Sequence, residues 1–202
     1  MYYIDLDDCV CETCLSLTEF ARERFGRDVR VADMTDYDLR VSFSFDEETY
    51  RRFMREFHGE KLESIPETPG AADVLRRWMG EGREPVIVTG RPTYSHDVTR
   101  AWLDARGLRN IRIIHVDKYA KLFNVSPDPL ITPFPDLKGM GFEFAVEDAP
   151  NAVRMIAETG LCPCAVFTRP WNAGYEAPAN FRRVGTWAEI EKITGTQTFF
   201  QQ

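Results

Sequence analysis

Short apolar runs alternate with amphipathic stretches along most of this chain. Five runs rich in β-branched or aromatic side chains predict buried strands at residues 2–5, 85–89, 111–116, 142–146 and 165–167. Between them, apolar residues recur at helical spacing, and one such stripe is stopped by Gly80 and Gly82. Alternating strands and helices predict a parallel sheet with helices on both faces, which is an α/β architecture.

The region after the first strand has a different pattern. Two helical stripes, around residues 17–25 and 50–57, flank an irregular stretch at residues 27–44. Asp46 is a plausible cap for the second of these helices. A segment at residues 64–70, containing two prolines and a glycine, is typical of a linker.

This change of pattern predicts an insertion into the α/β core. Residues 1–9 and 66–202 are expected to form the core, and residues 10–65 a small helical cap. Pro150 suits the first turn of the helix that follows the fourth strand. With 202 residues, the chain is long enough for one domain with such an inserted subdomain.

Charge and hydropathy narrow the possible partners. The net charge of −7 argues against a broad surface for a nucleic-acid polymer, because such surfaces are basic. No apolar run is long enough to span a membrane, and the first strand begins at Tyr2 without a leader. We therefore expect a cytoplasmic protein, with its oligomeric state left open.

The five cysteines form two close groups and invite a metal or redox interpretation. Cys11 and Cys14 follow the first strand, whereas Cys162 and Cys164 precede or open the fifth. In a parallel sheet these pairs lie at opposite ends, roughly 17 Å apart. Neighbouring carboxylates would also raise thiol pKa values, whereas reactive thiols need electropositive surroundings. We expect ordinary reduced thiols.

Clustered carboxylates end the first strand, in the tetrapeptide Asp5-Leu6-Asp7-Asp8. Like charges packed this closely stay ionised only if a cation or hydrogen bonds compensate them. Two aspartates separated by one residue suit a divalent metal, a nucleophilic carboxylate or a proton shuttle. Asp8 is interpreted as a helix cap.

Other polar side chains follow the neighbouring strands. The second strand ends in Thr89, Gly90 and Arg91, and the fourth ends in Glu147 and Asp148. Lys138 lies in the loop that leads into the fourth strand. Ligands of parallel sheets bind beyond the carboxyl ends of the strands, so these groups are expected to meet at one edge.

Together these groups suit metal-assisted phosphoryl transfer. Asp5 could attack phosphorus and form an aspartyl phosphate, and Asp7 could protonate the leaving oxygen and later accept a proton from water. Mg²⁺ would be held by Asp5, Asp148 and a main-chain carbonyl, which we assign to Asp7. Thr89 and Lys138 would hold the equatorial phosphate oxygens.

These motifs resemble those of the haloacid dehalogenase-like (HAD) hydrolases. Asp5-Leu6-Asp7-Asp8 looks like the first motif, Thr89 the second, Lys138 the third and Glu147-Asp148 the fourth. The resemblance implies a Rossmann-like, doubly wound sheet with a cap between the first and second motifs. It also implies substrate binding by Thr89, Gly90, Arg91 and Lys138, and a metal held by Asp5, Asp7 and Asp148.

Two positions depart from the family pattern. Glu147 stands where the family commonly has aspartate, so we expect Asp148 to bind the metal and Glu147 to act through water or a neighbouring side chain. Cys9 stands where threonine or valine is usual. Within the family, the segment from Met34 to Leu39 and the run Pro170-Trp171-Asn172 resemble the 5'(3')-deoxyribonucleotidases and related nucleotidases.

Several residues have two interpretations. Arg91 could contact phosphate or pair with an acidic neighbour. Trp171 and Asn172 could close over a substrate or form a plain turn. His96 and His115 have no partner at metal-ligand spacing in the sequence. Rings at Tyr37, Phe43 and Phe45 could stack on a base or pack in the core.

The resulting hypothesis is a Mg²⁺-dependent phosphomonoesterase that hydrolyses (deoxy)ribonucleoside monophosphates. An alternative is a phosphatase of another small metabolite, such as a sugar or organic-acid phosphate. A non-catalytic module that binds phosphate or metal, and a redox protein using Cys11 and Cys14, complete the alternatives. Dehalogenation is disfavoured, because Asp7 has no required role when the leaving group is a halide.

Overall fold

A six-stranded parallel sheet forms the centre of the molecule in the computed structural model, which describes residues 1–118 and 128–195. The strand order is β3-β2-β1-β4-β5-β6, with every neighbouring pair parallel. The strands are β1 (Tyr2–Ile4), β2 (Pro85–Thr89), β3 (Arg112–His115), β4 (Phe144–Glu147), β5 (Cys164–Phe167) and β6 (Arg182–Val184). The predicted doubly wound α/β fold is therefore confirmed.

Seven helices and five short 3₁₀ turns connect the strands within the described residues. The helices are α1 (Thr13–Phe25), α2 (Leu39–Phe43), α3 (Glu47–Glu60), α4 (Ala71–Gly80), α5 (His96–Asp104), α6 (Pro150–Thr159) and α7 (Trp187–Gly195). The turns are η1 (Val31–Asp33), η2 (Leu62–Ser64), η3 (Thr93–Ser95), η4 (Phe134–Met140) and η5 (Pro170–Asn172). None of these described helices is both long enough and apolar enough to cross a bilayer.

Alternation along β1 shows how the sheet is covered. Tyr2 and Ile4 pack with residues of α4, α5 and α7, whereas Tyr3 packs with residues of α6 and η4. Successive side chains of a strand point to opposite faces, so each strand contributes to two apolar layers. Tyr2 meets Trp78 edge to face at 5.1 Å, and Trp78 meets Trp187 at 6.0 Å.

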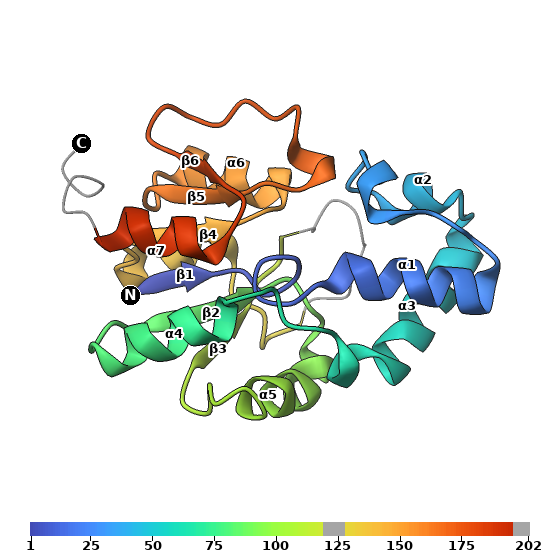
Figure 1. Cartoon of the computed structure of the whole chain (residues 1–202), viewed down its shortest axis with the longest axis horizontal. Coiled ribbons are helices and arrows are strands. Elements are labelled where there is room, and N and C mark those ends of the chain that lie inside the picture. Colours follow the sequence, from blue (N-terminus) through green and yellow to red (C-terminus); the bar gives the residue numbers. More distant parts are fainter. Residues whose placement is uncertain (119–127, 196–202) are drawn as a thin grey trace.

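Helices α1, α2 and α3 lie together beyond the end of the sheet toward which β1 runs (Figure 1). An aromatic cluster packs within this group, with ring centroids 5.2 to 6.2 Å apart: Phe20, Phe25, Phe43, Phe45, Phe53 and Phe57. Phe43 and Phe45 therefore take the core-packing role. The boundaries of the cap, residues 10–65, stay a prediction.

Local signals in the sequence account for several helix ends. The Asp46 side chain accepts the Thr49 N–H at 2.7 Å and caps α3, as predicted. Pro150 occupies the first turn of α6, also as predicted. Asp8 accepts the Cys14 N–H at 2.9 Å, which satisfies a first-turn donor of α1.

The sixth strand was not predicted. β6 has three residues, and its two arginines are exposed. An edge strand of this kind lacks the apolar run that marks a buried one, and its pairing with β5 comes from tertiary context.

Candidate active site

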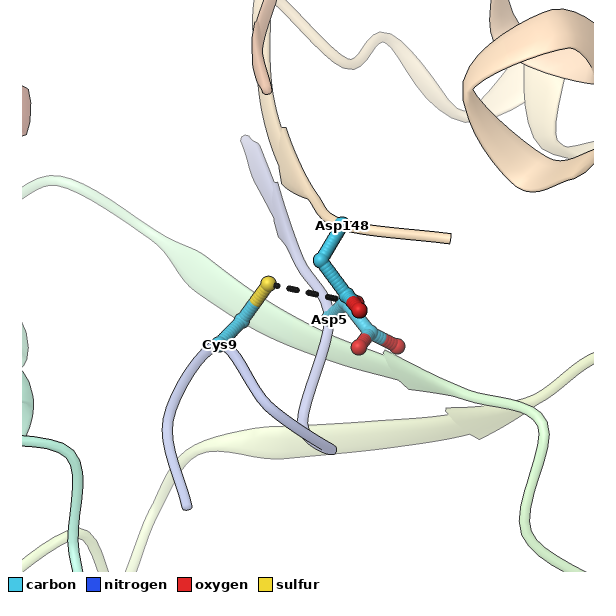
Figure 2. A group of neighbouring side chains, drawn as sticks. All are labelled: Asp5, Cys9 and Asp148. Carbon is cyan, nitrogen blue, oxygen red and sulfur yellow. Dashed lines mark hydrogen bonds between the residues drawn. The ribbon is translucent and has the colours of Figure 1, made fainter. Parts of the chain in front are cut away.

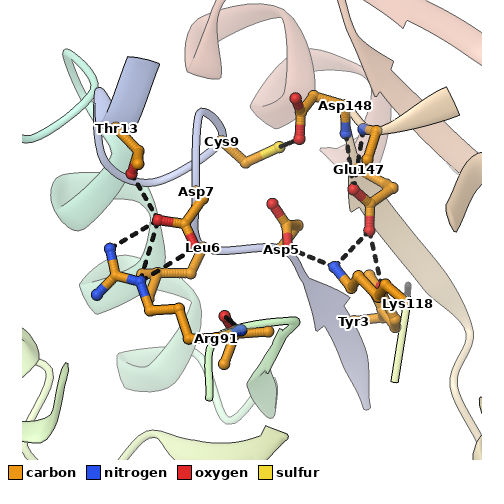
Figure 3. Close-up of polar contacts among 12 residues, drawn as sticks. Tyr3, Asp5, Leu6, Asp7, Cys9, Thr13, Arg91, Lys118, Glu147 and Asp148 are labelled. Atoms are coloured by element: carbon orange, nitrogen blue, oxygen red, sulfur yellow. Dashed lines mark hydrogen bonds and ion pairs between the residues drawn. The ribbon is translucent and has the colours of Figure 1, made fainter. Parts of the chain in front are cut away.

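Asp5 follows β1 directly and lies at the centre of a buried polar cluster (Figure 3). Lys118 Nζ donates to Asp5 Oδ1 and, at 2.7 Å, to Glu147 Oε2. Tyr3 Oη donates to the same Glu147 oxygen at 2.7 Å. Strand order explains why these residues meet. β1 lies between β2 and β4, at the point where successive strands begin to be added on the other side of the sheet.

Negative charge exceeds positive charge in this cluster. Burial raises the pKa of Asp5 well above its usual range, the charge of Glu147 adds to the increase, and Lys118 opposes it. Burial also raises the pKa of Asp148, with Asp5 and Glu147 acting in the same direction. Such a cluster is stabilised by an additional cation.

The carboxylates of Asp5 and Asp148 fit a hard divalent cation such as Mg²⁺. Asp5, Cys9 and Asp148 each place one ligand atom within 4.8 Å of the others (Figure 2). Carboxylate oxygens are the ligands that Mg²⁺ prefers. Burial, followed by the charge of Asp148, raises the pKa of the Cys9 thiol well above its usual range, and a neutral thiol is a poor ligand for Mg²⁺.

Asp148 is held in place from the turn after β5. Trp171 Nε1 donates to its Oδ2 at 2.8 Å, and Asn172 Nδ2 donates to its main-chain carbonyl at 2.7 Å. Trp171 and Asn172 therefore have a role that neither interpretation foresaw. From the turn η5 they orient a candidate metal ligand. Such outer contacts fix the position of a ligand and tune its affinity.

The Glu147 carboxylate accepts hydrogen bonds from neighbouring groups, and it is not one of the three possible ligands Asp5, Cys9 and Asp148. Its Oε1 accepts the main-chain N–H groups of Asp148 and Ala149 at 3.1 and 3.0 Å. Its Oε2 accepts from Tyr3 and Lys118. Its action toward the metal, through water or a neighbouring side chain, stays a prediction.

The Asp7 carboxylate points away from Asp5 and pairs with Arg91 (Figure 3). Arg91 Nη2 and Nε donate to it at 2.7 and 3.0 Å, and Thr13 Oγ1 donates at 2.5 Å. Burial acts to raise the pKa of Asp7. The charge of Arg91, its hydrogen bonds and the hydrogen bond from Thr13 outweigh burial and bring the pKa below its usual value. Asp7 is thus ionised at neutral pH in this arrangement.

Arg91 takes the pairing role, and its contact with phosphate stays a prediction. Its guanidinium is almost fully buried, and it also donates to Thr99 Oγ1 at 3.2 Å and to Cys11 Sγ at 3.5 Å. Each of its three side-chain nitrogens makes at least one of these contacts, so Arg91 holds Asp7 in position. Thr89 is fully buried at the end of β2, where its Oγ1 accepts the Arg91 N–H at 3.1 Å.

The lysine of the site is Lys118, and the prediction of Lys138 was wrong. Lys138 is exposed on η4, which precedes β4, and nearby Gly141 lies beside the N-terminus at Met1. That is the amino end of β1, opposite Asp5. Lys118 follows β3 at the carboxyl edge, where Asn151 of α6 donates to its carbonyl at 2.7 Å.

The cysteines behave as ordinary thiols. All five are free, and all but Cys162 are buried. Burial raises the pKa of Cys11 and of Cys14, and neighbouring aspartates act in the same direction. This environment disfavours thiolate formation, so a redox site at Cys11 and Cys14 receives no support.

His58 of α3 contacts the connection that follows β2, and no sequence pattern indicated this contact. Its Nδ1 lies 2.7 Å from the Tyr94 hydroxyl, which belongs to η3 after β2. Burial lowers the pKa of His58 to about 4, the charge of Arg91 acts in the same direction, and Asp7 opposes both. The imidazole is therefore neutral near the Asp7–Arg91 pair.

Replacing His58 by glutamine is expected to change how stability depends on pH. The pKa of His58 is about 4 in the folded protein and 6.5 in the unfolded chain. Between these pH values only the unfolded chain binds the proton, so the free energy of unfolding of the wild type falls as pH falls. Between pH 8 and pH 5, the His58→Gln variant should gain about 1–2 kcal/mol relative to the wild type. Urea unfolding at both pH values measures this, and a difference that is independent of pH would contradict it.

No family model matches the chain, but two curated relatives do. A Halalkalibacterium halodurans protein named "Putative nucleotidase BH1399" is 24% identical over 188 residues, covering 93% of this chain and 89% of the relative. The Bacillus subtilis protein named "Putative nucleotidase YqfW" is 23% identical over 190 residues, covering 92% of this chain and 89% of the relative.

A solved structure shows the same fold. The crystal structure of a HAD family hydrolase from Deinococcus radiodurans R1, with bound phosphate and sodium, superposes with a TM-score of 0.67. It is 13% identical, and the match covers 99% of this chain and 96% of the other. The chain therefore has the fold of the HAD-like hydrolases, as the motifs indicated.

Proposed function

We propose that this protein, whose fold is that of the HAD-like hydrolases, is a Mg²⁺-dependent phosphomonoesterase acting on nucleoside monophosphates. One observation carries the chemistry. The Asp5 carboxylate stands at the carboxyl edge of the sheet, between the Lys118 ammonium and the Asp148 carboxylate. This arrangement suits a nucleophile that receives a phosphoryl group.

The proposed reaction has two halves. In the first, an Asp5 oxygen bonds to phosphorus while the ester P–O bond breaks, and the leaving oxygen takes a proton. In the second, water attacks phosphorus of the aspartyl phosphate and loses a proton. Inorganic phosphate leaves and the Asp5 carboxylate is restored. Thr89 and Lys118 are assigned to the phosphate oxygens, where charge gathers in the transition state.

Asp7 is assigned to both proton transfers. Ionised beside Arg91, it is ready to accept the proton of the attacking water. To protonate the leaving oxygen it must first separate from Arg91 and take up a proton from solvent, because the guanidinium stabilises its charged form. The proton that Asp7 later accepts from the attacking water then serves the next turnover.

The metal site is assigned to Asp5, Asp148 and the main-chain carbonyl of Asp7. Mg²⁺ bound there would supply positive charge toward the phosphate oxygens. Lys118 supplies a fixed cation on the other side of Asp5, and Trp171 keeps Asp148 directed at the site.

The nucleotide class rests on the relatives' names and on aromatic side chains near the site. Tyr37 lies 6.5 Å from Trp171, centroid to centroid, and Trp171 contacts Asp148. Tyr94 is 73% exposed beside His58. An exposed ring such as that of Tyr94 can stack on a base.

Phosphate release from a panel of nucleoside monophosphates, sugar phosphates and organic-acid phosphates tests this proposal. We expect Mg²⁺-dependent hydrolysis, with kcat/KM for the best nucleotide at least about tenfold above the best sugar phosphate, equivalent to about 1.4 kcal/mol. Higher values for a sugar or organic-acid phosphate would reject the nucleotide class but keep the hydrolase. No hydrolysis across the panel would contradict the hydrolase itself.

A further inference from the structure

Two histidines that are distant in the sequence meet outside the Asp5 cluster. His96 begins α5 and is exposed, whereas His115 ends β3 and is buried. The nitrogens His96 Nδ1 and His115 Nε2 lie 3.1 Å apart, with ring centroids separated by 5.3 Å. Neither residue has a partner at metal-ligand spacing in the sequence, because the fold brings together the start of α5 and the end of β3.

The surroundings of His115 fix which nitrogen carries its proton. His115 Nδ1 lies 2.9 Å from the main-chain carbonyl of Arg91. A carbonyl oxygen can only accept, so Nδ1 is the donor and the Nε2 lone pair points toward His96. Burial lowers the pKa of His115, which favours the neutral ring with this lone pair available.

We propose that His96 Nδ1 and His115 Nε2 bind a divalent transition-metal ion of the Zn²⁺ class. Two nitrogens bound to one tetrahedral Zn²⁺ at about 2.0–2.1 Å lie roughly 3.3 Å apart, so a small movement of exposed His96 suffices. Water would complete the coordination, because His96 faces solvent. This site is separate from the Asp5 group and does not depend on the proposed function.

The second contact of His115 matches that of a metal ligand. Histidines that bind metals almost always donate their other ring N–H to a carbonyl or carboxylate, as His115 does to Arg91. Asp128 adds negative charge near His115 and acts to raise its pKa. Thr93 and the Leu130 N–H hold the Asp128 carboxylate in place.

The proton balance of binding is simple. With neutral His115 donating from Nδ1, the 3.1 Å contact requires His96 Nδ1–H to donate to the lone pair of His115 Nε2. Metal binding requires the other neutral tautomer of His96, with its proton on the solvent-facing Nε2. Both ligands stay neutral, and no net proton is released.

Metal titration of the untagged protein, stripped with chelator and dialysed into excess Mg²⁺, tests this proposal. Mg²⁺ occupies the carboxylates and competes poorly for imidazole. Co²⁺ serves as the spectroscopic probe, and Zn²⁺ is then followed by its displacement of Co²⁺. We expect one equivalent of Co²⁺ bound with nitrogen and oxygen ligands, and no thiolate charge-transfer band.

Matched variants assign the ion. The chain has three histidines, so His58→Gln is the control for His96→Gln and His115→Gln. We expect each of the latter to weaken Co²⁺ binding at least about tenfold, with His58→Gln and Asp148→Asn unchanged. Since His96 is exposed, its substitution tests the site even if the His115 variant folds poorly.

The proposal would be overturned by unchanged affinity in His96→Gln, by loss of binding in Asp148→Asn, or by a thiolate band that assigns the ion to cysteine. Absence of Co²⁺ binding by the wild type would also reject it.

Discussion

Replacing Lys118 by methionine is expected to impair both stability and activity. Lys118 is 1% exposed, and its ammonium pairs with the carboxylates of both Asp5 and Glu147. Removing one partner of a buried ion pair costs about 3–5 kcal/mol, because the remaining charges stay buried. Loss of a group that stabilises transition-state charge lowers kcat by about 10²–10³-fold. Urea unfolding and phosphate release measure the two effects.

Lys138→Met is the matched control for this substitution. Lys138 is exposed on η4, so its loss should change the free energy of unfolding by less than about 0.5 kcal/mol and leave kcat unchanged. Part of the stability lost in Lys118→Met should return as pH falls, because protonation of the carboxylates removes their unpaired charge. A large effect in Lys138→Met with a small one in Lys118→Met would reverse the assignment of the lysine.

Replacing Asp5 by asparagine is expected to abolish turnover while preserving the fold. An amide lacks the charge needed to attack phosphorus, so kcat should fall by about 10⁴-fold or more. The variant also removes one of three neighbouring buried carboxylates, and Lys118 keeps Glu147 as a partner. We therefore expect the free energy of unfolding to change by no more than about 1 kcal/mol.

Near-wild-type phosphate release by Asp5→Asn would exclude Asp5 as the nucleophile. Unfolding of the variant would leave that role to be decided by the labelling experiment below, which uses the wild-type protein. Asp8→Asn is a useful companion, because Asp8 accepts the Cys14 N–H of α1 and has no assigned chemical role. Its substitution should retain turnover.

Much of the fold followed from apolar periodicity. Four of the five predicted strands are fully buried runs, and β3 is buried in its second half. Their side chains supply both layers of the core, so their pattern is strong. The edge strand β6 has no such pattern, because two of its three residues face solvent. The helical pattern of residues 17–25 and 50–57 was also clear, since their phenylalanines pack on each other.

The candidate site was predictable where residues directly follow a strand. Asp5 and Asp148 follow β1 and β4, and strand order alone brings them together. Lys118 was missed because it follows β3 through a short loop, whereas Lys138 was chosen for its sequence spacing to Asp148. The usable signal was the position of Lys118 after a strand, since only that places it at the carboxyl edge.

Other contacts lay beyond the sequence pattern. The pairing of Asp7 with Arg91 and the hydrogen bond from Trp171 to Asp148 depend on side-chain direction. So does the meeting of His96 and His115. A periodic pattern shows which face a residue occupies, but not which polar partner it finds there.

Acid-quenched trapping of the phosphorylated protein tests the central claim most directly. Wild-type protein turning over its best substrate with Mg²⁺ is quenched, and borohydride reduces any aspartyl phosphate to homoserine before peptide mass analysis. The account predicts homoserine at position 5 with substrate present, and none without substrate or in Asp5→Asn. Rapid turnover without trapped label at Asp5, or label at Asp7 or Asp148 instead, would contradict it.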